Sequence, residues 1–251
     1  MGLSLIDQLL WFLSAALPIL IIARIIYERI YVPPFDGFTF MLGVVVARDL
    51  VLACLHYGSH RYTIAWEFSL PVILVSQIYA ALQNVVSITR MYPRFGKAAV
   101  RLFLGCFVVI ALCCCLGLPF ELHYITGESA VLRMFFLAQR WVDGCIAGTL
   151  IIACGVLMRS PAPPRQPAAN LVLHTCLLTI YFGGYSVLFF LENLAPLGAH
   201  QNLERAQFAL VVFLYTLWAT CLSAKRQRSR RWPEVTAILF RKVTSYGLPQ
   251  P

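Results

Sequence analysis

Long apolar stretches joined by short connections dominate this sequence. A helix needs roughly 20 apolar residues to cross the hydrocarbon core of a bilayer, which is about 30 Å thick. Seven stretches have about this length, namely residues 6–27, 38–57, 64–87, 98–120, 136–158, 171–194 and 206–224. The sequence therefore predicts an all-α, polytopic membrane bundle of seven transmembrane helices within residues 1–224, with no room for a separate extramembrane domain.

The composition agrees with a chain that is mostly surrounded by lipid. Hydrophobic residues make up 60% of the 251 residues, charged residues make up 12%, and the mean hydropathy is +0.75. A soluble domain carries about 25% charged residues. The first apolar stretch lacks a positive region before it and has Arg24, Glu28 and Arg29 behind it. It is therefore expected to remain as a helix and not to be removed as a signal peptide.

Lysine and arginine are concentrated in alternate connections. The first, third and fifth connections and the tail contain Arg24, Arg29, Arg90, Arg94, Lys97, Arg101, Arg159, Arg165 and then seven further basic residues between 225 and 242. The opposite set contains little beyond Arg61 and Arg205. Because basic loops stay on the cytoplasmic side, this asymmetry predicts an outside N-terminus and a cytoplasmic C-terminus. The net charge of +9 is thus interpreted as a signal for orientation, and no nucleic-acid partner is expected.

Residues 225–251 are predicted to form a basic cytoplasmic tail. The run 225–231 adds on the order of 1 kcal/mol of attraction per charge to anionic lipid headgroups. Val235, Leu239 and Val243 then recur at helical spacing behind Trp232 and Pro233, which favours a short amphipathic helix in the membrane interface. A docking surface for a soluble partner is the alternative interpretation.

Ionisable side chains inside the predicted spans are the main candidates for a functional site, because each is costly in a bilayer. The candidate ligand-binding residues are Arg48, Asp49, Glu67, Arg140 and Asp143. Given the predicted orientation, they fall in the outer half of the bundle. Arg140 and Asp143 are three residues apart on one helical face, so they can pair with each other or with Asp49 and Arg48. The alternatives are an interhelical charge network that fixes packing, an outward-facing ligand pocket, and a proton or ion path.

Two histidines form a weak candidate for a metal site. His56 and His60 are four residues apart and Glu67 follows, which are residue types that bind zinc. His60 is expected to lie beyond the end of its helix, and no second histidine pair occurs in the sequence. A pair of interfacial histidines is therefore favoured over a set of metal ligands.

The cysteines and one row of glycines are interpreted as packing features. All nine cysteines fall inside apolar segments, where cysteine usually acts as a small hydrophobic residue, so neither a disulfide framework nor a zinc module is expected. Gly144 and Gly148 form a small-xxx-small pair, with Gly155 near the same face. Such a face lets another helix approach closely, and packing within one chain is favoured over dimerisation.

Several well-known membrane and enzyme classes lack their signatures here. Lys97, Lys225 and Lys242 are the only lysines and none lies in a span, which excludes a retinal Schiff base. There is no His-Glu-x-x-His, no P-loop and no Gly-x-Ser-x-Gly. No Asp-Arg-Tyr closes the third stretch, which ends Ser87-Ile88-Thr89-Arg90, so the usual receptor signature is missing. Neither a cofactor nor an enzymatic activity is predicted.

The first three stretches carry a loose resemblance. Arg24-Ile25-Ile26-Tyr27, Phe35, Phe40, Arg48-Asp49, Trp66-Glu67 and Tyr79 resemble a group of uncharacterised bacterial integral membrane proteins with seven predicted helices. The resemblance implies a helical bundle in a bacterial inner membrane, and it implies no activity.

The leading functional hypothesis is a non-enzymatic sensor or small-ligand-binding membrane protein that uses the outer-half polar residues. A small transporter or channel is the first alternative, with Gln77, Gln83 and Asn84 as the candidates for the inner half of its path. An accessory protein of a membrane complex, assembling through the glycine face, is the second.

Overall fold

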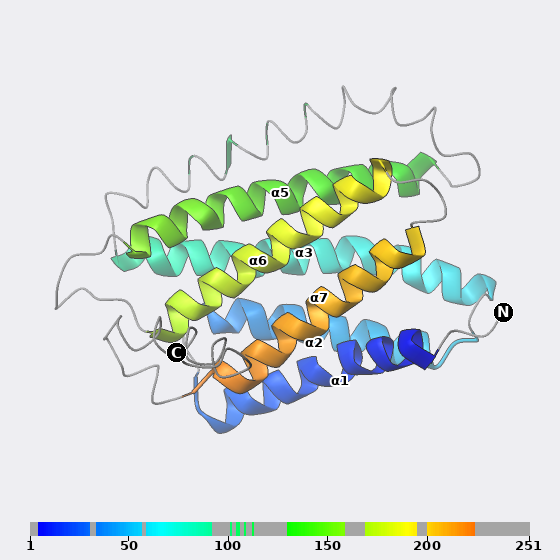
Figure 1. Cartoon of the computed structure of the whole chain (residues 1–251), viewed down its shortest axis with the longest axis horizontal. Helices are drawn as coiled ribbons and strands as arrows, with labels where there is room; N and C mark the ends of the chain where they lie inside the picture. The colour runs from blue at the N-terminus through cyan, green and yellow to red at the C-terminus, as the bar shows by residue number, and fades with distance from the viewer. Residues whose placement is uncertain are drawn as a thin grey trace, which may run out of the picture.

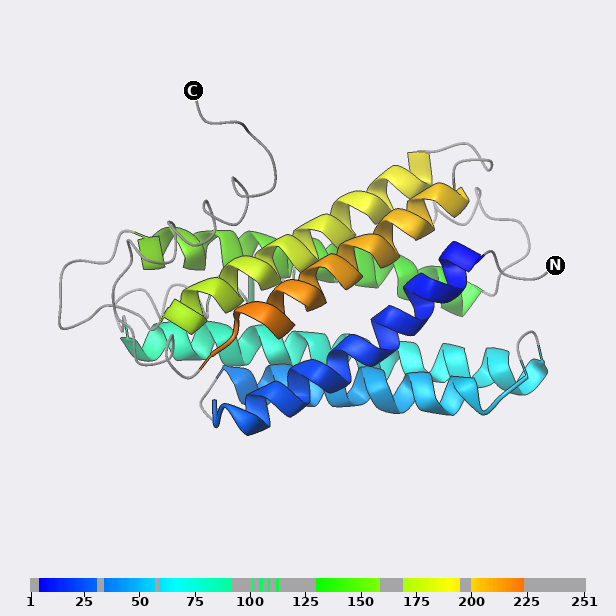
Figure 2. The same ribbon diagram turned by 60° about the horizontal axis from the view of Figure 1, so that its bottom comes forward.

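The structure is a computed structural model that describes residues 5–30, 34–56, 59–91, 130–158, 169–194 and 200–223, together with positions 101, 104, 105, 108 and 112. The described helices are α1 (Leu5–Tyr27), α2 (Phe35–Ala53), α3 (His60–Met91), α5 (Ala130–Met158), α6 (Ala169–Leu194) and α7 (His200–Cys221). No strand occurs in these ranges. The helices lie side by side as a bundle (Figures 1 and 2).

Six of the predicted stretches correspond to described helices. The apolar windows and the helices differ mainly at polar ends, since α3 begins at His60 and α7 begins at His200, each before the first residue of the predicted span. Most of the fourth stretch, 98–120, lies outside the described residues. So do the basic tail and the connection 159–168 before α6.

Three described helices are long and apolar enough to cross a membrane, by length and composition. They are α1, α3 over His60–Arg90 and α6 over Ala169–Leu191. The helices α2 and α5 carry Arg48, Asp49, Arg140 and Asp143, whose charged side chains lower the hydropathy of their segments. The described part of the chain is thus an all-helical protein with several candidate membrane spans.

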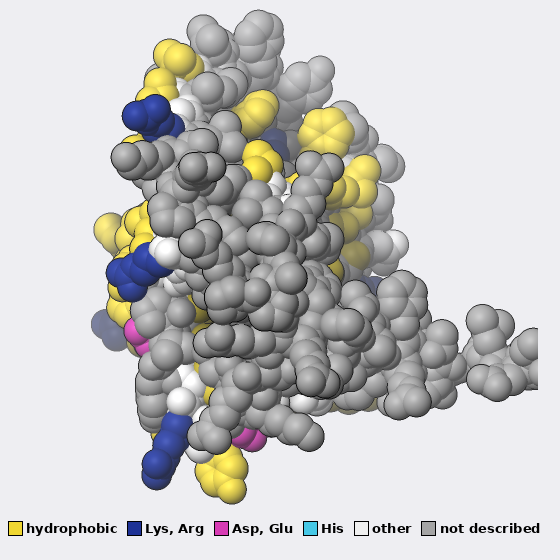
Figure 3. Space-filling model, turned by 90° about the vertical axis from the view of Figure 1, so that its left-hand side faces the viewer, with side chains coloured by type: hydrophobic (Ala, Val, Ile, Leu, Met, Phe, Trp, Pro, Cys, Tyr) yellow, Lys and Arg dark blue, Asp and Glu magenta, His cyan; other side chains and the backbone are white. Residues whose placement is uncertain are grey.

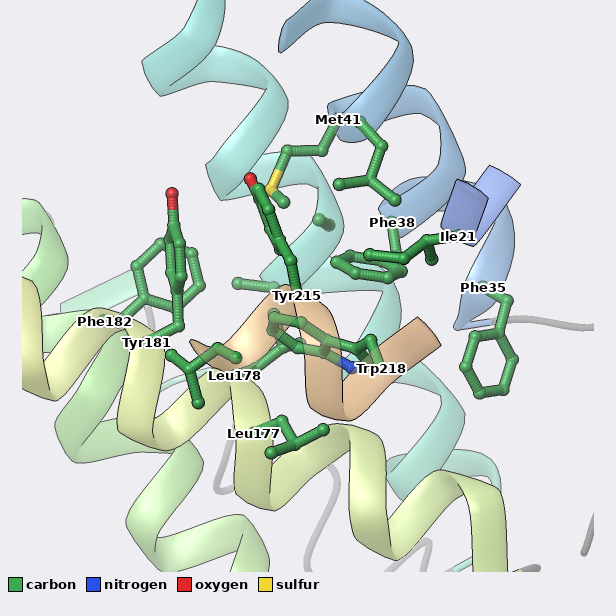
Figure 4. Packing of buried hydrophobic residues seen from close by; sticks show 14 of the residues in the cluster. Ile21, Phe35, Phe38, Met41, Leu177, Leu178, Tyr181, Phe182, Tyr215 and Trp218 are labelled. Atoms are coloured by element: carbon green, nitrogen blue, oxygen red, sulfur yellow. The ribbon is translucent and has the colours of Figure 1, made fainter. Parts of the chain in front are cut away.

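Large apolar side chains cover the outside of the bundle as well as its inside. Phe12, Leu20, Phe68 and Val75 are all exposed, and they belong to two of the candidate spans, α1 and α3. The interior contains Trp218, Tyr215, Phe35 and other large side chains that are almost fully buried (Figure 4). Contiguous exposed apolar surface of this kind is rare on soluble monomers and is typical of a surface that contacts lipid.

Specific contacts fix the direction in which each helix runs. The guanidinium of Arg205, at the start of α7, donates two hydrogen bonds to the Asp7 carboxylate at the start of α1, at 2.8 and 3.2 Å. At the other end, Arg24 donates to the Ala219 and Leu222 carbonyls, both at 2.6 Å. Hence α1 and α7 run in parallel. The hydrogen bonds to Asp7 raise the pKa of Arg205 above its ordinary value, so this cation stays charged.

The same reasoning gives the direction of α3 and α5. Gln77 and Asn84 of α3 contact Tyr181 and Thr175 of α6 respectively, so α3 and α6 are antiparallel. In α5, Gly144 faces Ser186 while Cys154 contacts Cys176, so α5 and α6 are antiparallel too. It follows that α3 and α5 run in the same direction. We name the end where α1, α3, α5 and α7 begin the Asp7 end, and the opposite one the Arg24 end.

Candidate functional site

Three of the predicted site residues are brought to the same depth in the bundle. Gly144 of α5 lies against Ser186, Gln77 of α3 bonds to Tyr181, and a side chain on Gly37 of α2 would meet Gln83. Because neighbouring helices are antiparallel and each residue rises about 1.5 Å, these contacts place Arg48, Asp49 and Asp143 within about one helical turn of the same level. That level is in the half of the bundle nearer the Asp7 end.

Asp143 is the most unusual of these residues. Its side chain is 1% exposed, and its Oδ1 atom has no hydrogen-bond partner among the described residues. No ion pair joins it to any other residue in the described ranges. A buried carboxylate without a partner is costly, since burying an isolated charge requires compensation by a proton, a cation or hydrogen bonds. The Oδ1 atom of Asp143 therefore requires one of these three forms of compensation.

A group of tyrosines lies next to this carboxylate. Tyr181 and Tyr185, one turn apart on α6, both interact electrostatically with Asp143 and with Arg48. The Tyr181 hydroxyl accepts a hydrogen bond from Gln77 Nε2 at 3.2 Å and lies beside the hydroxyls of Tyr185 and Tyr215.

Figure 4 shows the hydroxyls of Tyr181 and Tyr215 pointing in the same direction from α6 and α7. Asp49 of α2 interacts electrostatically with Tyr215. We call this group the polar cluster, and its members come from five helices: Arg48, Asp49, Gln77, Asp143, Tyr181, Tyr185 and Tyr215.

Arg48 pairs with Asp49 and not with Asp143. The Arg48 Nε atom is 3.7 Å from Asp49 Oδ1, which is an ion pair between neighbours in the chain but too long for a hydrogen bond. The same Nε atom is buried and has no hydrogen-bond partner in the part of the chain that the structure describes. The cluster thus holds an unsatisfied donor on Arg48 and an unsatisfied acceptor on Asp143 at about the same depth.

The other two predicted residues take different places. Arg140 is half-buried about one turn before Asp143 on α5, and the spacing of three residues does not produce an ion pair between them. Glu67 is also half-buried and lies almost three turns, about 15 Å, from Gln77 toward the Asp7 end, which is within about one turn of the level of Asp49. Among the described residues, no hydrogen bond or ion pair joins Glu67 to the polar cluster.

His56 and His60 lie at the ends of α2 and α3, and both are exposed. Within the described ranges, no group of three or more histidine, cysteine, aspartate or glutamate side chains is arranged to hold a metal ion. The residues of the polar cluster offer two carboxylates, a guanidinium, an amide and three phenol hydroxyls, and none of them is an imidazole or a thiol. The chemistry of the cluster thus favours recognition of a polar group.

The tyrosines and one histidine were not among the residues selected from sequence. His174 is fully buried toward the Arg24 end, where its Nδ1 atom accepts a hydrogen bond from Trp218 Nε1 at 3.1 Å. The Phe35 and Phe38 rings lie 4.8 Å from its imidazole, centroid to centroid. The sequence does contain a signal, because His174, Tyr181 and Tyr185 recur at spacings of seven and four residues and hence share one face of α6.

Comparison of the chain with known protein families, curated proteins and solved structures finds no match.

Proposed function

We propose that this is a seven-helix integral membrane protein of the cell membrane that binds a small polar ligand at the polar cluster. The observation that carries this proposal is the buried Asp143 carboxyl, whose Oδ1 atom has no partner in the described part of the protein. Polar groups buried in membrane helices are usually paired, and those that are not mark functional sites by default.

The direction of the helices supports seven spans. Because α3 and α5 run in parallel, α3 ends at the Arg24 end and α5 begins at the Asp7 end. Our proposal therefore places a further crossing of the bundle between residues 91 and 130. The apolar stretch 98–120, at a rise of 1.5 Å per helical residue, is long enough to do this as a membrane helix of about 35 Å.

The distribution of arginines supports the orientation. Arg24, Arg29 and Arg90 are all at the Arg24 end, where α1 and α3 finish. Figure 3 looks onto this end and shows several lysine or arginine side chains in dark blue. By the positive-inside rule we assign the Arg24 end to the cytoplasm and the polar cluster to the outer half of the membrane.

The chemistry of the cluster indicates the class of ligand. Asp143 offers an acceptor that favours a protonated amine or another cationic group, and aromatic rings such as Tyr181 and Tyr185 add favourable contacts with a cation. Arg48 offers a hydrogen-bond donor to an acceptor on the same ligand. We therefore propose a small amine, with a zwitterionic amino compound as the form that would use both groups.

Transport is less well supported by the same contacts. A transporter needs polar groups that continue toward the cytoplasm, and Gln77, Gln83 and Asn84 are the candidates. Gln77 and Asn84 instead bond to α6, with Asn84 Nδ2 at 3.1 Å from Thr175 Oγ1. The Gln83 amide donates to the Tyr79 hydroxyl of its own helix at 3.0 Å. Between the polar cluster and the Arg24 end, the described helices are joined by such contacts and by apolar packing. This favours a binding site over a conducting path.

The binding proposal is tested by ligand-dependent thermal stability of the purified full chain. The probes are methylamine, a series of longer primary amines, and glycine and alanine as zwitterions. A probe that binds is expected to raise the Tm of the parent protein, because a ligand that binds only the folded state stabilises it. Asp143→Asn is expected to lose the shift, whereas Asp36→Asn, at an exposed aspartate of α2, keeps it. An equal shift in Asp143→Asn contradicts the proposal.

The orientation has its own test, because the only lysines are Lys97, Lys225 and Lys242. All three are assigned to the cytoplasmic side. A membrane-impermeant amine reagent added to intact cells is expected to leave them unmodified and to modify them after permeabilisation. Modification of any of the three in intact cells contradicts the assigned orientation.

A further inference from the structure

Two cysteines from different helices touch each other away from the polar cluster. The Sγ atoms of Cys154 in α5 and Cys176 in α6 are 3.8 Å apart. Both residues are reduced and partly buried. They lie nearer the Arg24 end than Asp143 does, so they belong to a different part of the bundle.

Small residues create the close approach that places these sulfurs together. Gly144 faces Ser186, and a side chain on Gly183 would lie 3.7 Å from Ala147 Cβ. These two contacts and the cysteine contact follow one antiparallel register. Glycine and alanine at a membrane helix interface allow the backbones to come close. The position of the sulfurs is therefore fixed by an extended helix interface.

A neighbouring hydroxyl orients the two thiols. The Thr179 hydroxyl donates to the Thr175 carbonyl at 2.7 Å, so its oxygen is left to accept. Cys154 Sγ is 3.5 Å from that oxygen and can donate its proton there. The Cys176 thiol can then donate to Cys154 Sγ. This arrangement directs a sulfur lone pair of Cys154 toward Cys176.

We propose that Cys154 and Cys176 are a redox-active dithiol that hydroperoxides convert into an intramolecular disulfide joining α5 to α6. A disulfide has an S–S bond of about 2.05 Å, so the two sulfurs must approach by roughly 1.8 Å. Rotation about χ1 of the two cysteines, with a small adjustment of the helices, supplies this movement. The proposal does not depend on ligand binding at the polar cluster.

The reaction balances with the hydroperoxide as the two-electron oxidant. One thiol, after losing its proton, attacks the peroxide, so that the O–O bond breaks and a sulfenic acid forms with release of water or alcohol. The second sulfur then attacks the sulfenic sulfur, the S–S bond forms, and the sulfenic oxygen leaves as water. Two sulfurs are oxidised by one electron each, and the peroxide is reduced. A neutral hydroperoxide can enter the membrane, and the partial exposure of both cysteines leaves them open to it.

The test uses the full chain in native membranes, with a protease recognition sequence inserted between residues 159 and 168. Cleavage there separates Cys154 from Cys176. After treatment with hydrogen peroxide and blocking of the remaining thiols, cleaved chains are expected to stay joined on a denaturing gel without reductant. They are expected to separate when dithiothreitol is added. Mass spectrometry should find the two cysteine peptides linked with the loss of two hydrogens.

Matched variants identify the pair. Cys154→Ser and Cys176→Ser are each expected to lose the joined product, while Cys145→Ser on α5 and Cys221→Ser on α7 keep it. Size-exclusion profiles of all variants check that the bundle is intact. The proposal is overturned if the parent fragments separate after oxidation, if the joined product persists in Cys154→Ser or Cys176→Ser, or if mass spectrometry finds these cysteines only as sulfinic or sulfonic acids.

Discussion

Replacement of Asp143 by asparagine is expected to stabilise the protein while it weakens ligand binding. A charged side chain near the centre of a membrane costs about 2.5–3.5 kcal/mol on insertion scales. Asparagine has nearly the same shape, and its unpaired amide costs about 1–3 kcal/mol. The difference between the mid-range values gives a gain of about 1 kcal/mol in the free energy of unfolding. For a chain of about this length, each kcal/mol changes the Tm by about 2–4 °C, so we expect a rise of about 2–4 °C.

The assay is thermal unfolding of the purified full chain in detergent without ligand, followed by tryptophan fluorescence. Asp36→Asn is the control, because Asp36 is exposed and substitution of such a residue is usually within about 0.5 kcal/mol of neutral. The gain in stability arises only if the carboxyl is uncompensated in the folded protein. The change in Tm therefore tests whether Oδ1 of Asp143 lacks a partner in the folded protein.

The opposite result would refute this reasoning. If Asp143 is half of a structural ion pair, its removal leaves a buried cation and lowers stability by about 3–5 kcal/mol. A structural network that includes Asp49 would also make the two substitutions couple by about 0.5–3 kcal/mol, whereas independent sites add within about 0.5 kcal/mol. We expect the stability changes of Asp49→Asn and Asp143→Asn to add. A destabilised Asp143→Asn protein, or strong coupling, would assign the carboxyl to packing.

Three further substitutions test the packing of the bundle between the polar cluster and the Arg24 end by the same thermal assay. Gly37→Leu is expected to cost about 1–3 kcal/mol, because its Cβ would lie 3.0–3.1 Å from α3 atoms, whereas Gly43→Leu has open space and should be near neutral; equal effects would contradict the close α2–α3 contact. Asn84→Leu should cost about 0.6 kcal/mol and no more than about 1.7, as is usual for one hydrogen bond between membrane helices. Trp218→Phe should cost about 1–3 kcal/mol, because it leaves the buried His174 Nδ1 without its donor; an unchanged Tm would show that this bond is unimportant.

The course of the helices was largely predictable, and the differences have a physical cause. The apolar windows locate residues that favour hydrocarbon, but a helix continues wherever its backbone can bond to itself. Consequently α7 begins at His200, before Glu204 and Arg205, although the apolar window begins later. At that polar end, Arg205 is free to reach Asp7 on α1. The hydropathy of a sequence segment contains no information about such contacts between helices.

The candidate site was predictable in part. Arg48, Asp49 and Asp143 were identified because ionisable residues are conspicuous in an apolar sequence. Their partners were not, since pairing depends on the rotation of each helix about its axis and on its neighbours. The spacing of Arg140 and Asp143 permits an ion pair, but the described structure has none between them.

The tyrosines were missed for a different reason. Tyrosine counts as hydrophobic in composition, so Tyr181, Tyr185 and Tyr215 did not stand out among apolar residues. Only packing against other helices brings their hydroxyls together beside Gln77. A search for polar aromatic residues at helical spacing, in addition to charges, would have found the stripe on α6.

The interface between α5 and α6 links the two sites that we propose. Asp143 lies on α5 close to Gly144, and Tyr181 and Tyr185 lie on α6, so the small-residue contacts hold the carboxyl at its level beside the tyrosines. Cys154 and Cys176 occupy the same interface, about three turns away on α5. A disulfide there would restrict any sliding or separation of the two helices. If ligand binding at Asp143 requires such movement, oxidation changes the affinity, and by thermodynamic reciprocity the bound ligand changes the ease of oxidation.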